Sequence, residues 1–88
     1  MGFTAGSAYA MARDVAEGYV MVTERTFKTL TKADMDQLTF ELDRYLRELR
    51  GNQPDLEDIP AIQLRQRKMQ RLTSTLTMLR SFRQRQRL

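Results

Sequence analysis

Apolar residues recur every three or four positions between residues 32 and 50, which is the spacing of one face of an α-helix. Thr31 and Asp34 stand where a capping box would begin this helix, with Asp in the usual place of Glu. Gly51 directly follows the last periodic turn and is expected to end the helix in a left-handed conformation. The pattern therefore predicts a capped helix over residues 32–50. Its apolar stripe consists of Met35, Leu38, Leu42, Tyr45, Leu46 and Leu49.

Residues 59–86 carry two apolar strips, which predicts a second, longer helix after a polar linker over residues 51–58. Pro54 turns the chain within the linker, Asp58 is the expected N-cap, and Pro60 is tolerated in the first helical turn. A helix with two apolar strips usually contacts two neighbours, so the pattern favours a bundle over a simple hairpin. The strips are a heptad-like seam of Ile62, Met69, Leu72, Leu76 and Leu79, and a weaker strip of Leu64, Met78 and Phe82.

The N-terminal third has two interpretations. Residues 7–24 fit one helical face capped by Ser7. Residues 19–30 are also strand-like in composition around Glu24 and Arg25, which would make a short β-hairpin. Helix is favoured, because Glu-Arg lacks the Asn, Asp or Gly that a tight hairpin turn requires. The residues on the helical face are Ala8, Met11, Ala12, Val15, Tyr19 and Val22.

These elements predict an all-α fold in a single small domain, residues 1–88. It is a three-helix bundle or a helical hairpin with a long basic C-terminal helix, and the short β-hairpin near residues 19–30 is the alternative. A chain of 88 residues buries only about 60–65% of its surface. Six Met residues suit an adaptable apolar face. A protein partner or a homo-oligomer is therefore expected.

Charge is distributed unevenly along the chain. The first sixty residues hold seven basic and eleven acidic side chains, a balance of −4. The last 28 residues hold eight basic side chains and no acidic one, which brings the net charge to +4. Arg, which suits phosphate and carboxylate best, supplies seven of the eight. The candidate nucleic-acid-binding residues are Arg65, Arg67, Lys68, Arg71, Arg80, Arg83, Arg85 and Arg87.

This basic segment has a functional and a structural interpretation. Contacts with phosphates would give sequence-independent and strongly salt-dependent binding to DNA or RNA. Alternatively, the Arg side chains cover apolar surface with their stems and keep their charges in water. Phe82 is the one aromatic residue of the segment, so base stacking is poorly supported.

Several classes of function are excluded by composition or spacing. The chain has no Cys and no His, which excludes zinc fingers, thiol nucleophiles and Ser-His-Asp triads. No carboxylates stand at a catalytic spacing, and the acidic residues 55–58 suit helix capping better than metal binding. No Gly-Lys-Ser/Thr phosphate loop follows Gly2 or Gly6. We therefore expect a protein that is not an enzyme and that has no metal or cofactor.

Location and membrane association follow from the same composition. No apolar run approaches the roughly 20 residues of a membrane span. The N-terminus has neither the basic nor the apolar region of a signal peptide. The long helix has four hydroxyl residues at its centre and a single aromatic residue, unlike most interfacial helices. A cytoplasmic protein that does not bind membranes is expected.

In outline, and without a shared motif, the chain resembles two classes of assembly protein. The small subunits of CRISPR effectors are basic helical bundles that line a nucleic-acid channel. Phage head-completion proteins combine a short helix, a hairpin, a capped helix and a basic tail. The expected function is sequence-independent binding to nucleic-acid backbone as a small subunit of a larger nucleoprotein complex. The alternative is a structural or adaptor subunit that docks its Arg-rich helix on an acidic protein surface, as in head-completion assembly.

Overall fold

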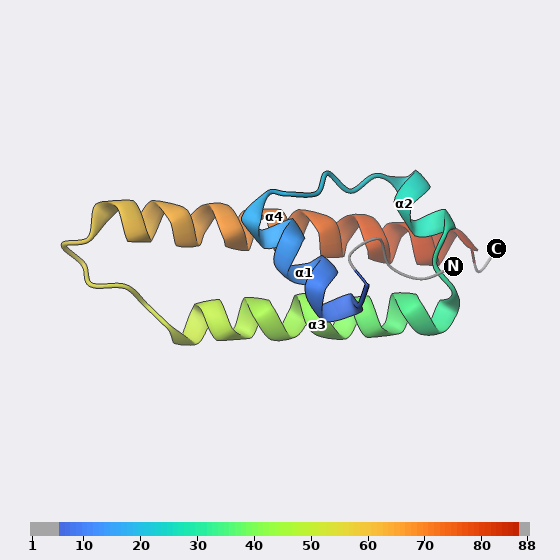
Figure 1. Ribbon diagram of the computed structural model, residues 1–88, viewed down its shortest axis with the longest axis horizontal. Coiled ribbons are helices and arrows are strands. Elements are labelled where there is room, and N and C mark those ends of the chain that lie inside the picture. The colour runs from blue at the N-terminus through green and yellow to red at the C-terminus, as the bar shows by residue number, and fades with distance from the viewer. Residues whose placement is uncertain (1–5, 87–88) are drawn as a thin grey trace.

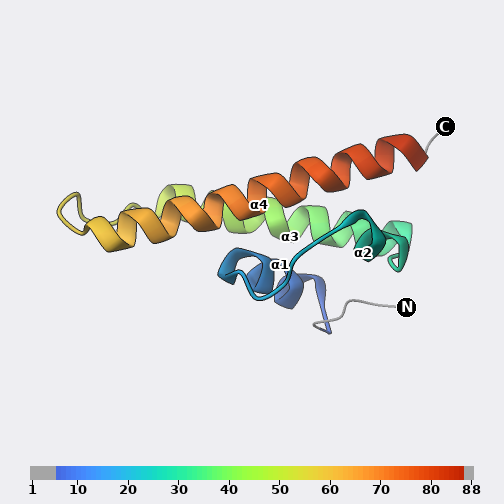
Figure 2. The same cartoon turned by 90° about the horizontal axis from the view of Figure 1, so that it is seen from above.

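Two long antiparallel helices form the body of the computed structural model, which describes residues 6–86 (Figure 1). They are α3 (Lys32–Gly51) and α4 (Ile59–Gln86). The shorter α1 (Ala8–Glu17) packs on both of them, and α2 (Glu24–Lys28) packs on α4 near its C-terminal end (Figure 2). The principal dimensions are 47 × 25 × 19 Å. The predicted all-α bundle is confirmed.

The first helix is shorter than the sequence pattern suggests. It begins as expected, with the Ala10 amide donating to the Ser7 hydroxyl at 3.1 Å. It ends at Glu17, because Gly18 adopts φ +81° and the next amides turn back on the helix. The Gly18 N–H donates to the Val15 carbonyl at 3.1 Å, and the Tyr19 N–H donates to Asp14 at 2.9 Å. This glycine cap overrides the apolar periodicity that favoured a helix over residues 7–24.

Residues 19–30 form an extended connection followed by the five-residue helix α2. No strand is present in residues 6–86, so the alternative of a β-hairpin is wrong. The side chain of Phe27 is fully buried, and its ring centroid lies 5.6 Å from that of Phe82 on α4. Burial of this ring holds α2 on the bundle, because five residues are too few to form a stable helix alone.

The helix α3 begins as the sequence predicts and ends differently. The Asp34 amide donates to Thr31 Oγ1 at 3.0 Å, and the Thr31 amide donates to the Asp34 carboxylate at 3.1 Å. Gly51, however, is still helical, and Asn52 caps the helix with φ −111°. Arg65 of α4 donates from Nε to the Leu49 carbonyl at 2.7 Å. A side chain of α4 thus satisfies one of the terminal carbonyls of α3, which have no partner within the helix.

The helix α4 begins at the expected place. Asp58 caps it by accepting from the Ala61 amide at 3.2 Å, and Pro60 lies in the first turn. Its apolar seam faces the other three helices. The resulting core contains Met11, Ala12, Val15, Ala16, Phe27, Leu30, Met35, Leu38, Leu42, Leu46, Leu72, Leu76, Leu79 and Phe82.

Candidate nucleic-acid interface

The predicted cations of α4 fall into two groups with different surroundings. Arg65, Arg67, Lys68 and Arg71 lie along the first half of the helix, and Arg80, Arg83 and Arg85 lie near its C-terminal end. Arg87 lies outside the described residues. The two groups are separated by more than two helical turns without a charged residue.

Two cations of the first group donate hydrogen bonds to the C-terminal ends of other helices. Arg71 donates from Nη1 to the Ala16 carbonyl at 3.0 Å, in the last turn of α1. Arg65 serves α3 in the same way through its bond to the Leu49 carbonyl. The C-terminal end of a helix carries partial negative charge and unpaired carbonyls, so cations stabilise it. The structural interpretation of the basic segment therefore accounts for these two residues.

Lys68 also stabilises the end of α1, through an ion pair with Glu17. Its Nζ lies 3.0 Å from Glu17 Oε1, and the Lys68 side chain is 18% exposed. The hydrogen bond with Glu17 raises the pKa of Lys68 above its ordinary value of 10.5, although partial burial acts in the opposite direction. Lys68 is thus held charged by a partner within the protein.

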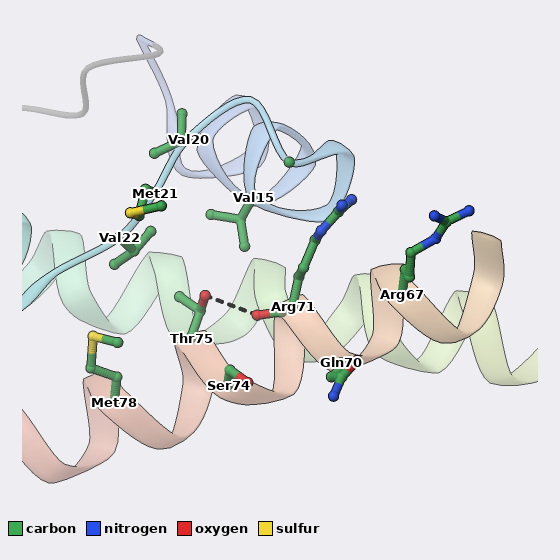
Figure 3. A pocket seen from close by; sticks show the side chains of 11 residues that line it. Val15, Val20, Met21, Val22, Arg67, Gln70, Arg71, Ser74, Thr75 and Met78 are labelled. Carbon is green, nitrogen blue, oxygen red and sulfur yellow. Dashed lines mark hydrogen bonds between the residues drawn. The ribbon is translucent and has the colours of Figure 1, made fainter. Parts of the chain in front are cut away.

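Arg67 is the exception within the first group. Its side chain is exposed and makes no hydrogen bond or ion pair within residues 6–86. It lies one turn before Arg71 on the same side of α4 (Figure 3). Of the four cations in this half of the helix, Arg67 is the one whose charge is free for a ligand.

In the second group, two of the three described cations, Arg80 and Arg85, are exposed, and Arg83 is half-buried. Arg83 pairs with Asp36 of α3 and lies 3.5 Å from Thr39 Oγ1. Arg85 pairs with Glu24 of α2, yet its side chain remains 60% exposed. Arg80 is exposed and has no ion pair with any described residue. Exposed ion pairs are weak, so a ligand with several phosphates could compete for Arg85, whereas Arg83 is 21% exposed and is held by two partners.

The fold gathers further cations around this second group. The N-terminal part of α3, the helix α2 and the C-terminal part of α4 meet at one end of the bundle (Figures 1 and 2). Residues 24–36 and 80–86 together hold six basic and three acidic side chains, a balance of +3. The opposite end, residues 47–68, holds five basic and four acidic side chains, a balance of +1. The first of these we call the basic end, with cations Arg25, Lys28, Lys32, Arg80, Arg83 and Arg85.

Two hollows at the basic end lie between α3 and α4, and each is lined by at least one cation. One, of about 390 Å³, is lined by Thr39, Arg80, Arg83 and Gln84. The other, of about 270 Å³, is lined by Lys32, Met35, Arg83 and Gln86. Arg83 borders both, so the hollows are neighbours. Both combine positive charge with uncharged hydrogen-bonding side chains.

Sequence reasoning missed the contribution of α2 and α3 to this surface. Lys32 stands beside acidic neighbours in the sequence and gives no sign of belonging to a basic site. It joins the site because the antiparallel packing of α3 on α4 places the start of one helix beside the end of the other (Figure 1).

Metal sites, membrane-spanning helices and similarity to known proteins would each indicate a different function. Within residues 6–86, no group of three or more His, Cys, Asp or Glu side chains is placed to hold a metal ion. No helix in this described part of the chain has the length and apolar character needed to cross a membrane. No family model, curated protein or solved structure matches the chain.

Proposed function

We propose that this protein is a non-catalytic helical protein that binds the phosphate backbone of nucleic acid through its basic end, as a small subunit of a larger nucleoprotein complex. The observation that carries the proposal is the pair of neighbouring hollows that share Arg83 and are flanked by Lys32 and Arg80. Cations from two helices bordering one depression can contact successive phosphates. No contact with base edges is required, so the binding is sequence-independent.

The surrounding side chains support this use of the surface. Gln84 and Gln86 offer amide N–H groups beside the cations, and such groups bind phosphate oxygens as a supplement to Arg and Lys. The two aromatic rings at this end, Phe27 and Phe82, are buried, which favours phosphate contact over base stacking. Binding should therefore differ little among sequences and depend strongly on salt.

The test is a salt titration with labelled single- and double-stranded DNA and RNA. Binding should weaken steeply between about 50 and 300 mM salt, with a slope that reports several phosphate contacts. The double variant K32Q/R80Q should bind about tenfold more weakly and lower the magnitude of that slope by about 2. Anisotropy of a fluorescent oligonucleotide measures both quantities.

A matched control uses the opposite end of the bundle. The variant R47Q/R50Q removes the same charge from exposed positions of α3 and should bind nearly as tightly as the wild type. If both double variants weaken binding equally, net charge rather than the basic end is responsible. If the wild type fails to bind any of the four nucleic acids at low salt, the proposal is wrong.

A structural or adaptor role is the second candidate, and the exposed apolar side chains favour it. Tyr19, Met21, Phe40, Leu56 and Ile59 are all more than half exposed in the described chain. In this role the basic end would dock on an acidic protein surface. The same K32Q/R80Q variant distinguishes the two candidates. If the protein is an adaptor, the variant should disrupt assembly with the protein partner and leave nucleic-acid binding unchanged.

A further inference from the structure

A groove of about 560 Å³ runs between α4 and the connection from α1 to α2, and we call it the connector groove (Figure 3). Its two ends differ in chemistry. Val20, Met21 and Val22 of the connection and Met78 of α4 line one end, and Arg67 and Arg71 lie on successive turns of α4 at the other (Figure 3). An occupant must therefore be apolar at one end and polar at the other.

The connection itself is an extended segment whose backbone has no partner. Residues 19–23 are in neither a helix nor a turn. The backbone N–H and C=O groups of Val20, Met21 and Val22 make no hydrogen bond with any residue of the described chain. Hydrogen bonding resumes at the Thr23 N–H, which donates to Thr26 Oγ1 at 3.3 Å. A row of unpaired backbone groups is the feature that allows an extended peptide to add as a β-strand.

The side chains of this segment also follow a strand pattern. Tyr19 and Met21 are 78% and 89% exposed, whereas Val20 and Val22 between and after them are half-buried. Such alternation, in a run of β-branched and aromatic residues, is typical of a strand with one covered face. The strand-like composition that suggested a hairpin therefore has a second explanation, since pairing can be completed by another chain.

The charge of the groove restricts what can bind there. Arg67 has no ion pair within residues 6–86, and Arg71 uses Nη1 for the Ala16 carbonyl while the rest of its guanidinium lies beside Gly18. No carboxylate lines the connector groove. The cationic end is thus complementary to an acidic side chain. Gly18, which lies beside Arg71, and Met21 are three residues apart, or about 10 Å along an extended chain. This spacing sets the distance along a bound peptide between its apolar and acidic residues.

We propose that the connector groove binds an extended, acidic segment of a partner protein. The segment pairs its backbone with residues 20–22 and packs apolar side chains against Val22 and Met78. An Asp or Glu about three or four residues along it pairs with Arg67 and the free side of Arg71. This docking goes beyond nucleic-acid binding and is independent of it, because no cation of the basic end lines the groove.

Selection from a random library of displayed peptides of about 12 residues tests the proposal without knowledge of the partner. Selected peptides should combine alternating apolar residues with Asp or Glu three or four positions away. In the wild-type protein, a synthetic peptide of the selected sequence should slow amide exchange at least about tenfold, measured by NMR, either at Met21 or at Val20 and Val22, because the N–H groups that face one edge of a strand belong to alternate residues. Selection of Lys- or Arg-rich peptides, or of none, would overturn the proposal.

Two sets of variants locate the bound peptide. Met21→Pro and Val22→Pro each remove a backbone N–H that has no partner in the described chain, and these two N–H groups face opposite edges of the segment. The substitution on the paired edge should weaken peptide binding at least about tenfold. Met21→Ala keeps the N–H and removes the exposed side chain, so it should bind more tightly than Met21→Pro if the Met21 N–H is on the paired edge. Arg67→Gln should weaken binding about three- to fivefold, whereas Arg50→Gln on the far end of α3 should not change it.

Each outcome bears on the site directly. Peptide binding that is equally tight in Met21→Pro, in Val22→Pro and in the wild type would exclude strand addition, because the two substitutions together test both edges of the segment. A lower melting temperature of Met21→Pro would mean that the substitution disturbs the fold. In that case the amide exchange of the wild-type protein is the test, and no slowing by the peptide at any of residues 20–22 would overturn the proposal. Displacement of the peptide by an oligonucleotide that protects the same amides would show that Arg67 and Arg71 bind phosphate rather than carboxylate.

Discussion

The guanidinium group of Arg71 lies against Gly18, so closely that a Cβ added to this glycine would be 2.9 Å from Arg71 Cζ. The same guanidinium donates to the Ala16 carbonyl at 3.0 Å. Gly18 thus does two things: it adopts the left-handed conformation that ends α1, and it leaves room for the cation that caps that end. Arg71, which the sequence predicts to bind nucleic acid, therefore stabilises the packing of α1 on α4.

Gly18→Ala should lower the free energy of unfolding by about 1.5–3 kcal/mol. About 1–2 kcal/mol comes from placing a Cβ in the left-handed region, and the remainder from moving Arg71 off the Ala16 carbonyl. Urea denaturation measures the change. Gly51→Ala is the control, because Gly51 is helical and a Cβ there meets nothing within 4 Å. That substitution should leave stability unchanged or raise it slightly. Equal destabilisation by both would contradict the role assigned to Gly18.

Arg65 and Arg67 are two residues apart on α4 and should differ in their effect on stability. Arg65→Gln removes the donor to the Leu49 carbonyl and should destabilise the fold by about 1 kcal/mol. Arg67→Gln removes an exposed charge with no partner in residues 6–86 and should change stability by less than about 0.5 kcal/mol. Thermal or urea unfolding of the two variants tests the assignment, which fails if Arg67→Gln is the more destabilising.

The ion pair between Lys68 and Glu17 should make stability depend on alkaline pH. Folding raises the pKa of Lys68 above 10.5, so the folded state holds this proton more tightly than the unfolded state. The resulting stabilisation is fully present below pH 10.5 and is lost as the pH rises through the raised pKa of the folded state. The difference in free energy of unfolding between wild type and Lys68→Met should therefore shrink above pH 10.5. A difference that stays constant into strongly alkaline solution would show that the pair contributes nothing.

The sequence predicted the elements that local chemistry determines. The capping box of Thr31 and Asp34, the N-cap Asp58 and the apolar stripes of α3 and α4 all depend on residues within a few positions of one another. Gly18 ends α1 by an equally local rule, but the predicted helix over residues 7–24 followed the periodicity of Val15, Tyr19 and Val22 and ran past it. Tyr19 proved to be exposed, which shows that the periodicity beyond Gly18 was accidental.

The candidate site was less predictable, because it depends on contacts between distant parts of the chain. Arg65 and Arg71 look identical to Arg67 in the sequence, and only the packing of α1 and α3 on α4 distinguishes helix-capping cations from a free one. Lys32 joins the basic end for the same reason. A count of charges along a segment therefore overestimates a binding site wherever some of the cations serve the fold.

Freeing the cations of the basic end should strengthen nucleic-acid binding if that surface is the interface. Glu24 and Asp36 pair with Arg85 and Arg83. The carboxylates are 42% and 59% exposed, and although Arg83 itself is 21% exposed, the amides that replace them in Gln and Asn keep an oxygen acceptor for each Arg. The variant E24Q/D36N should therefore fold normally, bind DNA or RNA about three- to tenfold more tightly, and increase the salt slope by about 1–2.

The control for this variant is E48Q/E57Q, which removes two negative charges from exposed positions at the opposite end of the bundle. It raises the net charge by the same amount without touching the pairs of Arg83 or Arg85. Oligonucleotide anisotropy in low salt should show a clearly smaller gain for this variant. Equal gains from the two variants would mean that overall charge attracts the nucleic acid and that the hollows around Arg83 have no special part in binding it.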